Sequence, residues 1–306
     1  MKIFVLGAGV QGTVFAVRLT KAGHQVTLVA SPGRMEDLRV SGARIQNELT
    51  SVAATLALPV VPSLPSDRSA DLCLVTVRRE QIELVLPCLA QATGIGRFVF
   101  LVNHANGSED LFRVLGKRRV VVAFPGVAGS LENGIVRFIE IPQQPTAIES
   151  DAYDVAAILR EAGLRVSRVN DMDAWLCRHA VFITAIAGAL YETDCDPHRL
   201  AQDRAAVRRF VRGVQEGWRA LDRRHTAPAP FALRAILCWV PLNISVGYWS
   251  KLLETRGELY FARHAPFEMA ALASDVRVLA GEREAPVLHE LLAAIDRYKN
   301  AQNNGQ

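Results

Sequence analysis

The chain has 306 residues, a formal net charge of +4 and 50% hydrophobic residues. This length can bury a large core and predicts two domains, because globular domains run to roughly 150 residues each. The basic residues form only short pairs without interleaved aromatics, which argues against nucleic-acid binding. The apolar stretches are too short to span a bilayer. The five cysteines form no C-x-x-C motif, so we expect free thiols, no metal and a cytoplasmic protein.

The first thirty residues predict a strand, a helix and a second strand. Residues 2–6 are a short apolar run suited to a buried parallel strand. Residues 14–22 have helical spacing, and Gly23 ends them as a C-terminal cap does. Residues 25–29 complete a βαβ unit of the usual size.

The remaining elements fall into two regions that meet near Asn170. Up to that point strands alternate with helices, which predicts a doubly wound, mostly parallel sheet. Strands are expected at 71–77, 98–102, 120–124, 136–141 and 164–169, and helices at 80–91, 108–115 and 153–162. Beyond it we expect only helices, at 172–192, 197–225, 229–239, 247–264, 266–282 and 286–299. The predicted fold is therefore α/β, with a Rossmann domain over 1–170 and an all-helical substrate or dimerisation domain over 171–306.

A glycine motif lies between the first strand and the first helix. Gly7, Gly9 and Gly12, with Val10 and Gln11 inside the motif, fit the pattern G-x-G-x-x-G. In this context the first glycine permits a tight turn, the second admits a pyrophosphate, and the third lets helix and strand pack closely. The helix N-terminus then offers N–H donors to the phosphates. The motif predicts a dinucleotide site made by these five residues, and a glycine turn without ligand is the alternative.

The choice of dinucleotide is read at the end of the second strand. An acidic residue there would bind the ribose 2′-hydroxyl of NAD, but none occurs before Glu36. Ser31 and Arg34 could instead bind a 2′-phosphate. We therefore expect NADPH as the cofactor, with a solvated loop arginine as the alternative for Arg34.

Several stretches of this half resemble the ketopantoate reductase (2-dehydropantoate 2-reductase) family. They are the opening motif, residues 22–28 (AGHQVTL), residues 71–78 (DLCLVTVR) with Gln81, and residues 100–103 (FLVN) with Gly107 and residues 109–111 (EDL). The resemblance covers residues 1–140 and continues weakly to Trp175. It implies an NADPH-dependent reductase of a 2-oxo acid, with a Rossmann domain, a helical domain and a substrate cleft between them. It also implies that Arg78 replaces a lysine near the cofactor, that Asn103 lies beside the nicotinamide, and that Arg34 reads the 2′-phosphate.

The helical half departs from that family at its proton donor. The resemblance implies a lysine just after the tryptophan and two asparagines on the next turns. Residues 176–183 hold no lysine, and Phe182, Ile183, Ile186 and Ala187 occupy the turns in question. Carbonyl reduction needs a proton donor, and arginine is a poor one. This difference favours another ketone or 2-oxo acid on the same scaffold over ketopantoate itself.

Two residues are candidates for the missing donor. His179 is the polar member of an otherwise apolar helix face with Met172, Trp175, Phe182 and Ile186, and it could serve as a general acid. A packed core histidine is the equally weighted alternative. Lys251 is the second candidate, with a solvated helix face as its alternative.

Substrate-binding candidates are Arg178, which could pair with a carboxylate, and Ser245 and Glu258, which are spaced approximately as the family requires. A surface arginine is the alternative for Arg178, and a solvated helix face is the alternative for Glu258. Ser250 is spaced as suitably as Ser245. We predict an NADP-dependent reductase of a small molecule, with a homodimer as one option and no membrane partner. An imine or opine reductase and a catalytically silent NADP-binding sensor are the competing functions.

Overall fold

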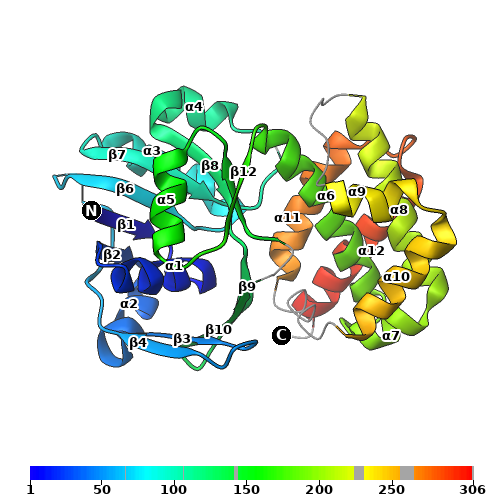
Figure 1. Cartoon of the computed structure of the whole chain (residues 1–306), viewed down its shortest axis with the longest axis horizontal. Helices are drawn as coiled ribbons and strands as arrows, with labels where there is room; N and C mark the ends of the chain where they lie inside the picture. The colour runs from blue at the N-terminus through cyan, green and yellow to red at the C-terminus, as the bar shows by residue number, and fades with distance from the viewer. Residues whose placement is uncertain (66, 106, 141–143, 224–230, 256–264, 305–306) are drawn as a thin grey trace. The chain divides into compact units, whose positions relative to one another are not determined.

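The computed structural model divides the chain into two compact units (Figure 1). The first, here the N-terminal unit, comprises Met1–Val102 and Gly107–Met172. The second, here the helical unit, comprises Asn103–Asn106 and Asp173–Gln306. The structure describes residues 1–65, 67–105, 107–140, 144–223, 231–255 and 265–304.

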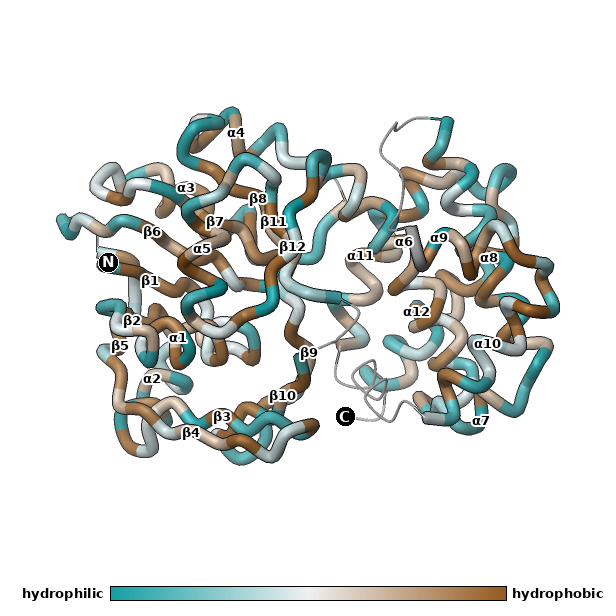
Figure 2. Tube along the Cα trace, viewed as in Figure 1, coloured by the Kyte–Doolittle hydropathy of each residue, from teal (hydrophilic) through white to brown (hydrophobic). Residues whose placement is uncertain are grey.

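The N-terminal unit is organised on an eight-stranded sheet. Its neighbouring strands are parallel except where β11 runs antiparallel to β8, which confirms the predicted mostly parallel α/β sheet. Figure 2 shows that β1, β7 and β8 are hydrophobic along most of their length. Such strands are favoured inside a parallel sheet that is covered on both faces. In sheet order the strands are β12 (Val166–Val169), β11 (Thr146–Glu149), β8 (Val120–Phe124), β7 (Ile95–Leu101), β6 (Ala70–Val75), β1 (Lys2–Leu6), β2 (Gln25–Val29) and β5 (Val60–Val61).

A second, four-stranded sheet in the same unit was not predicted as such. Its order is β4 (Ala53–Leu56), β3 (Ala43–Asn47), β10 (Ile135–Glu140) and β9 (Val127–Glu132). The expected strand at 136–141 belongs here, paired with β3 and β9, rather than to the large sheet. Helix α1 (Val10–Lys21) packs against strands of both sheets, so its residues Val14, Phe15 and Val17 are fully buried.

The other helices of this unit include one that the sequence analysis missed. Helix α2 (Pro32–Ser41) begins directly after β2, with Ser31 at its N-cap and proline at its first position. This pair is a common helix start, so the signal was present in the sequence. The remaining helices are α3 (Ile82–Gln91), α4 (Glu109–Leu115) and α5 (Tyr153–Glu161), with 3₁₀ turns at Arg79–Gln81 and Lys117–Arg119.

The helical unit is built around α6 (Met172–Tyr191). This helix passes the length and hydropathy criteria for a membrane span, but 83% of the tested window is buried inside the protein. The core helix of a globular domain meets the same criteria. The sequence predicted that this helix buries one apolar face, but α6 is buried on most of its sides.

Most of the other predicted helices are present with altered bounds. The expected helix over 197–225 is two helices, because the Asp203 carboxylate accepts N–H bonds from Ala205 and Ala206 at 2.9 Å and starts a new one. The helix expected from residue 247 already begins at Leu242. The observed elements are α7 (Pro197–Gln202), α8 (Arg204–Asp222), α9 (Phe231–Arg234) with a π turn at Ala235–Trp239, α10 (Leu242–Glu254), α11 (Pro266–Leu279) and α12 (Pro286–Asn304).

Candidate functional site

The glycine motif forms the loop between β1 and α1, as the sequence predicts. Gly7 has φ +106°, a left-handed conformation that strongly favours glycine. Gly9 is the N-cap of α1, and no side chain among the described residues caps the helix there. The first turn of α1 contains no acidic residue. An uncapped helix N-terminus with these features suits an anion, because its N–H groups need acceptors and the helix dipole favours negative charge.

The three glycines differ in what a side chain would meet. A Cβ on Gly12 would overlap the Gly7 carbonyl oxygen, and one on Gly7 would lie 3.0 Å from the Thr76 backbone. A Cβ on Gly9 has no heavy atom of the described residues within 4 Å. Internal packing therefore accounts for two of the glycines, whereas Gly9 faces open space. This arrangement fits a dinucleotide pyrophosphate approaching the backbone at Gly9.

Thr76 supports the loop from the neighbouring strand, a role that the sequence analysis missed. Its hydroxyl lies 2.9 Å from the Gly7 carbonyl oxygen and 3.1 Å from that of Leu6, and its N–H donates to Leu6 at 2.8 Å. These bonds fix the loop to the end of β6. Residues 71–78 carried part of the family resemblance, but nothing local to Thr76 signals a partner about seventy residues away.

Arg34 lies beside the glycine loop rather than in a solvated loop. Its Nε donates to the Ala8 carbonyl oxygen at 3.1 Å, and its Nη1 pairs with Asp37 one turn along α2. Its Nη2 is buried without a hydrogen-bond partner in the described part of the chain. Burial lowers the pKa of the guanidinium, against the opposing effect of Asp37. Ser31 is exposed and makes no side-chain capping bond.

Arg44 on β3 extends this charged group, since its Nη2 lies 3.7 Å from the other oxygen of Asp37. Asp37 therefore lies between two arginines. Arg78 is elsewhere, at the N-cap of the 3₁₀ turn after β6, with an exposed side chain. The structure brings Arg34 to the glycine loop, where it binds the Ala8 carbonyl oxygen.

Asn103 and His179 lie in the helical unit. Asn103 follows β7 by two residues, and its Oδ1 is buried with no hydrogen-bond partner from the residues that the structure describes. His179 is 9% exposed and stacks on Trp175, with the ring centroids 5.2 Å apart. Burial lowers the pKa of His179 to about 3, so the imidazole is neutral at physiological pH. A neutral imidazole is a weak proton donor, which favours the core-histidine alternative.

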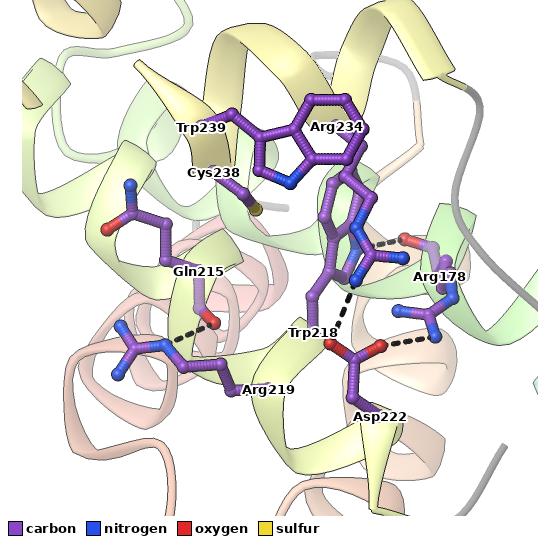
Figure 3. Close-up of a pocket in the computed structure, with 8 residues that line it drawn as sticks. All are labelled: Arg178, Gln215, Trp218, Arg219, Asp222, Arg234, Cys238 and Trp239. Carbon is purple, nitrogen blue, oxygen red and sulfur yellow. Dashed lines mark hydrogen bonds and ion pairs between the residues drawn. The ribbon is translucent and has the colours of Figure 1, made fainter. Parts of the chain in front are cut away.

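Arg178 is buried in an ion pair. Its Nη2 lies 2.6 Å from Oδ1 of Asp222 on α8, and its side chain is 3% exposed. The Trp218 indole N–H donates to the Arg178 carbonyl oxygen at 3.0 Å. Figure 3 shows this ion pair at the wall of a pocket of about 240 Å³. The surface-arginine alternative is therefore wrong for Arg178, and its guanidinium is already paired with a carboxylate.

The other described candidates of the helical unit, Ser245 and Lys251, differ in burial. Ser245 is fully buried, and its hydroxyl has no hydrogen-bond partner among the described residues. Lys251 is exposed in the last turn of α10. Glu258 lies outside the described residues. Among the residues that the structure describes, no group of three His, Cys, Asp or Glu side chains could hold a metal, and all five cysteines are free thiols.

Comparisons with known proteins agree with the resemblance drawn from the sequence. Residues 3–150 match the family described as ketopantoate reductase PanE/ApbA. A 2-dehydropantoate 2-reductase of Lactococcus lactis is 23% identical over 230 residues, which cover 71% of this chain and 72% of that protein.

Two solved structures share the fold over nearly the full chain. A PanE/ApbA family ketopantoate reductase from Ralstonia eutropha superposes with a TM-score of 0.78 at 18% identity, covering 99% of this chain and 100% of the other. D-mandelate dehydrogenase with NADH and anilino(oxo)acetate gives a TM-score of 0.73 at 16% identity, with 99% of each chain covered. The chain is therefore similar to ketopantoate reductases, with the family match in its residues 3–150, and it shares the fold of these solved structures over nearly its full length.

Proposed function

We propose that this protein is an NADPH-dependent reductase that transfers a hydride to the carbonyl of a small 2-oxo acid or ketone. The observation that carries the proposal is the glycine loop, where Gly9 faces open space in front of an uncapped helix N-terminus. The nicotinamide, when bound, supplies the hydride. The N–H groups of Val10, Gln11 and Gly12, in the first turn of α1, bind and orient the pyrophosphate.

NADPH is preferred over NADH because of the groups after β2. No acidic residue stands at the end of that strand to bind a ribose 2′-hydroxyl. Arg34 is held at the glycine loop, and one nitrogen of its guanidinium lacks a partner. A 2′-phosphate would supply that partner, with Ser31 as a second donor. NADH, present in the structure of D-mandelate dehydrogenase, is the competing cofactor.

A 2-oxo acid is the substrate class that the relatives share. The names of these proteins refer to 2-dehydropantoate and to mandelate, and the second structure holds anilino(oxo)acetate. In 2-dehydropantoate and anilino(oxo)acetate a carbonyl carbon lies next to the carboxylate, and in mandelate that carbon carries a hydroxyl group. The protein must also protonate the alkoxide that hydride transfer creates. We assign this step to Lys251, an exposed cation, with the buried His179 as the competing donor, and we assign the orientation of the reacting carbonyl to the Asn103 amide.

The test is NADPH consumption with 2-dehydropantoate and, separately, with phenylglyoxylate. The parent is compared with Lys251→Gln and His179→Asn, and the matched controls are Lys21→Gln and His198→Asn, both exposed positions. We expect turnover of at least one acid by the parent and both controls, and a loss of about 100-fold in kcat for Lys251→Gln, the lower end of what general acid catalysis contributes.

A parent that binds NADPH but turns over neither acid would contradict the proposal and favour a binding protein. An equal kcat for the parent and Lys251→Gln, with a loss in His179→Asn, would move the donor to His179.

The homodimer stays a prediction, which sedimentation of the same samples would check.

A further inference from the structure

The pocket at Arg178 uses none of the residues assigned above to cofactor or hydride transfer. We call it the arginine–tryptophan pocket, and Figure 3 shows the side chains that line it. It is lined by Arg178, Gln215, Trp218, Arg219, Asp222, Arg234, Cys238 and Trp239, all in the helical unit. Its volume of about 240 Å³ lies just under the range of roughly 300–1,000 Å³ typical of drug-sized ligands, so any occupant is small.

The lining of the pocket carries an excess of positive charge. Among the residues that the structure describes, three arginines and one aspartate line it, which leaves two positive charges over. Asp222 is shared, since its Oδ1 binds Arg178 at 2.6 Å and its Oδ2 lies 3.4 Å from Arg234. Arg219 donates its Nε to a neutral backbone oxygen, that of Gln215, at 3.2 Å. An anion would balance the cations that this single carboxylate leaves over.

The apolar part of the lining is aromatic. Trp218 is 2% exposed and forms a fixed wall, whereas Trp239 is 57% exposed. The guanidinium of Arg234 lies 6.0 Å from the centre of the Trp239 ring. Such an arrangement can stack a flat ligand on the indole while the arginine pairs with its charged group.

Cys238 adds a neutral group to the same pocket. In Figure 3 its sulfur points into the space between the Gln215 side chain and Trp218. Burial raises the pKa of the thiol, an effect that the nearby arginines oppose. At neutral pH the group is then a thiol without charge, which does not repel an anion.

We propose that the arginine–tryptophan pocket binds a small aromatic carboxylate, with the carboxylate paired to Arg234 and the ring stacked on Trp239. Guanidinium groups match carboxylates with two parallel hydrogen bonds, and exposed indole rings bind flat apolar surfaces. The pocket is thus a second ligand site, within the helical unit and separate from the glycine loop.

Protection of Cys238 from a thiol reagent tests the proposal without any cofactor. Cys88→Ser removes the other exposed thiol, since Cys73, Cys177 and Cys195 are buried. The sample is treated with N-ethylmaleimide at increasing benzoate concentrations, and labelling of the Cys238 peptide is followed by mass spectrometry. We expect benzoate to slow labelling in a saturable way, with inorganic phosphate at least tenfold less effective because it lacks the ring.

Substitutions identify the groups responsible. Arg234→Gln, in the Cys88→Ser protein, is expected to raise the half-protecting benzoate concentration about tenfold, the loss of one charge-assisted contact. Arg219→Gln removes a positive charge from the lining without removing that contact, so its effect should be smaller. Arg199→Gln on α7, an exposed arginine outside the pocket, is the control and should change nothing. Circular dichroism checks that every variant is folded.

Labelling that benzoate does not slow, or protection that is unchanged by Arg234→Gln, would overturn the proposal. Equal protection by phosphate and benzoate would overturn its aromatic part and leave an inorganic anion site. Because no NADPH is present, none of these results depends on whether the protein is a reductase.

Discussion

The two units of this protein present their candidate functional groups in different ways. In the N-terminal unit the candidate site is made largely of backbone, and Gly9 faces open space at the start of α1. In the helical unit the candidate polar side chains are largely buried, as with Arg178 on Asp222 and the stacked pair His179 and Trp175. A backbone site depends on local geometry, whereas a side-chain site depends on packing between distant segments. A family resemblance can therefore indicate the function of the backbone site in the N-terminal unit. In the helical unit the partners of the side chains must be known from the structure.

The largest expected effect concerns the ion pair that holds Arg178. Removing Asp222 as Asp222→Ala leaves a 3% exposed guanidinium without this carboxylate, and such losses cost about 3 kcal/mol when one partner is removed. Urea unfolding followed by tryptophan fluorescence measures it, because all four tryptophans lie in the helical unit. The control Glu284→Ala breaks the largely exposed pair with Arg223 and should cost less than about 1 kcal/mol. Equal losses would mean that Asp222 is not a structural partner.

The next largest effect is expected at Gly12, the glycine of the motif with the least room for a side chain. Gly12→Ala places a Cβ against the Gly7 carbonyl oxygen, and overpacking of this kind costs about 1–3 kcal/mol. Thermal unfolding by circular dichroism measures the loss. The control Gly247→Ala on α10 meets open space and should be neutral or stabilising, because alanine favours helix. A Gly12→Ala protein as stable as the parent would contradict the observed packing of α1 on the loop.

A smaller effect is expected at the site that distinguishes the two cofactors. Arg34→Gln should weaken NADPH binding about tenfold, through loss of a charge-assisted contact, and leave NADH binding nearly unchanged. Fluorescence titration with each dinucleotide measures both. Arg39→Gln, an exposed arginine on the same helix, is the control. If NADPH and NADH binding fell equally, Arg34 would not be reading the 2′-phosphate.

The smallest effect is pH-dependent and concerns His179. Its pKa is about 3 in the folded protein against 6.5 in an unfolded chain, so below pH 6.5 only the unfolded chain takes up this proton. Folding stability should therefore fall as the pH drops from 6.5 toward 3, by at most about 1.4 kcal/mol per pH unit from this group. Urea unfolding of the parent and of His179→Asn at pH 7 and pH 5.5 should show a smaller acid loss in the variant. The exposed His198→Asn should lose as much as the parent does.

The sequence was sufficient for the elements whose signals are local. The glycine spacing and the apolar run of residues 2–6 predicted β1, the loop and α1, and the change near Asn170 predicted a helical region. The four-stranded sheet was missed because β3 and β10 pair across about ninety residues, and the strand at 136–141 showed no sign of that partner.

The sequence also could not predict which side chains pair with one another in the helical unit. Arg178 and Asp222 are 44 residues apart, and helical periodicity indicates a face without naming what it meets. The same limit applies to His179, for which a donor and a core residue were equally weighted until its burial and stacking on Trp175 were known. The break at Asp203 and the start of α2 at Ser31 and Pro32 did carry local signals, in the form of capping residues.

The central claim is that the glycine loop of the N-terminal unit binds a nicotinamide dinucleotide, and calorimetric titration of NADPH tests it most directly. The parent is compared with Gly9→Val, since Gly9 has an extended backbone that other residues adopt and its Cβ would meet open space. The account predicts saturable binding by the parent and at least tenfold weaker binding by Gly9→Val, with equal melting temperatures. Absence of binding by the parent, or equal binding by both proteins, would contradict it.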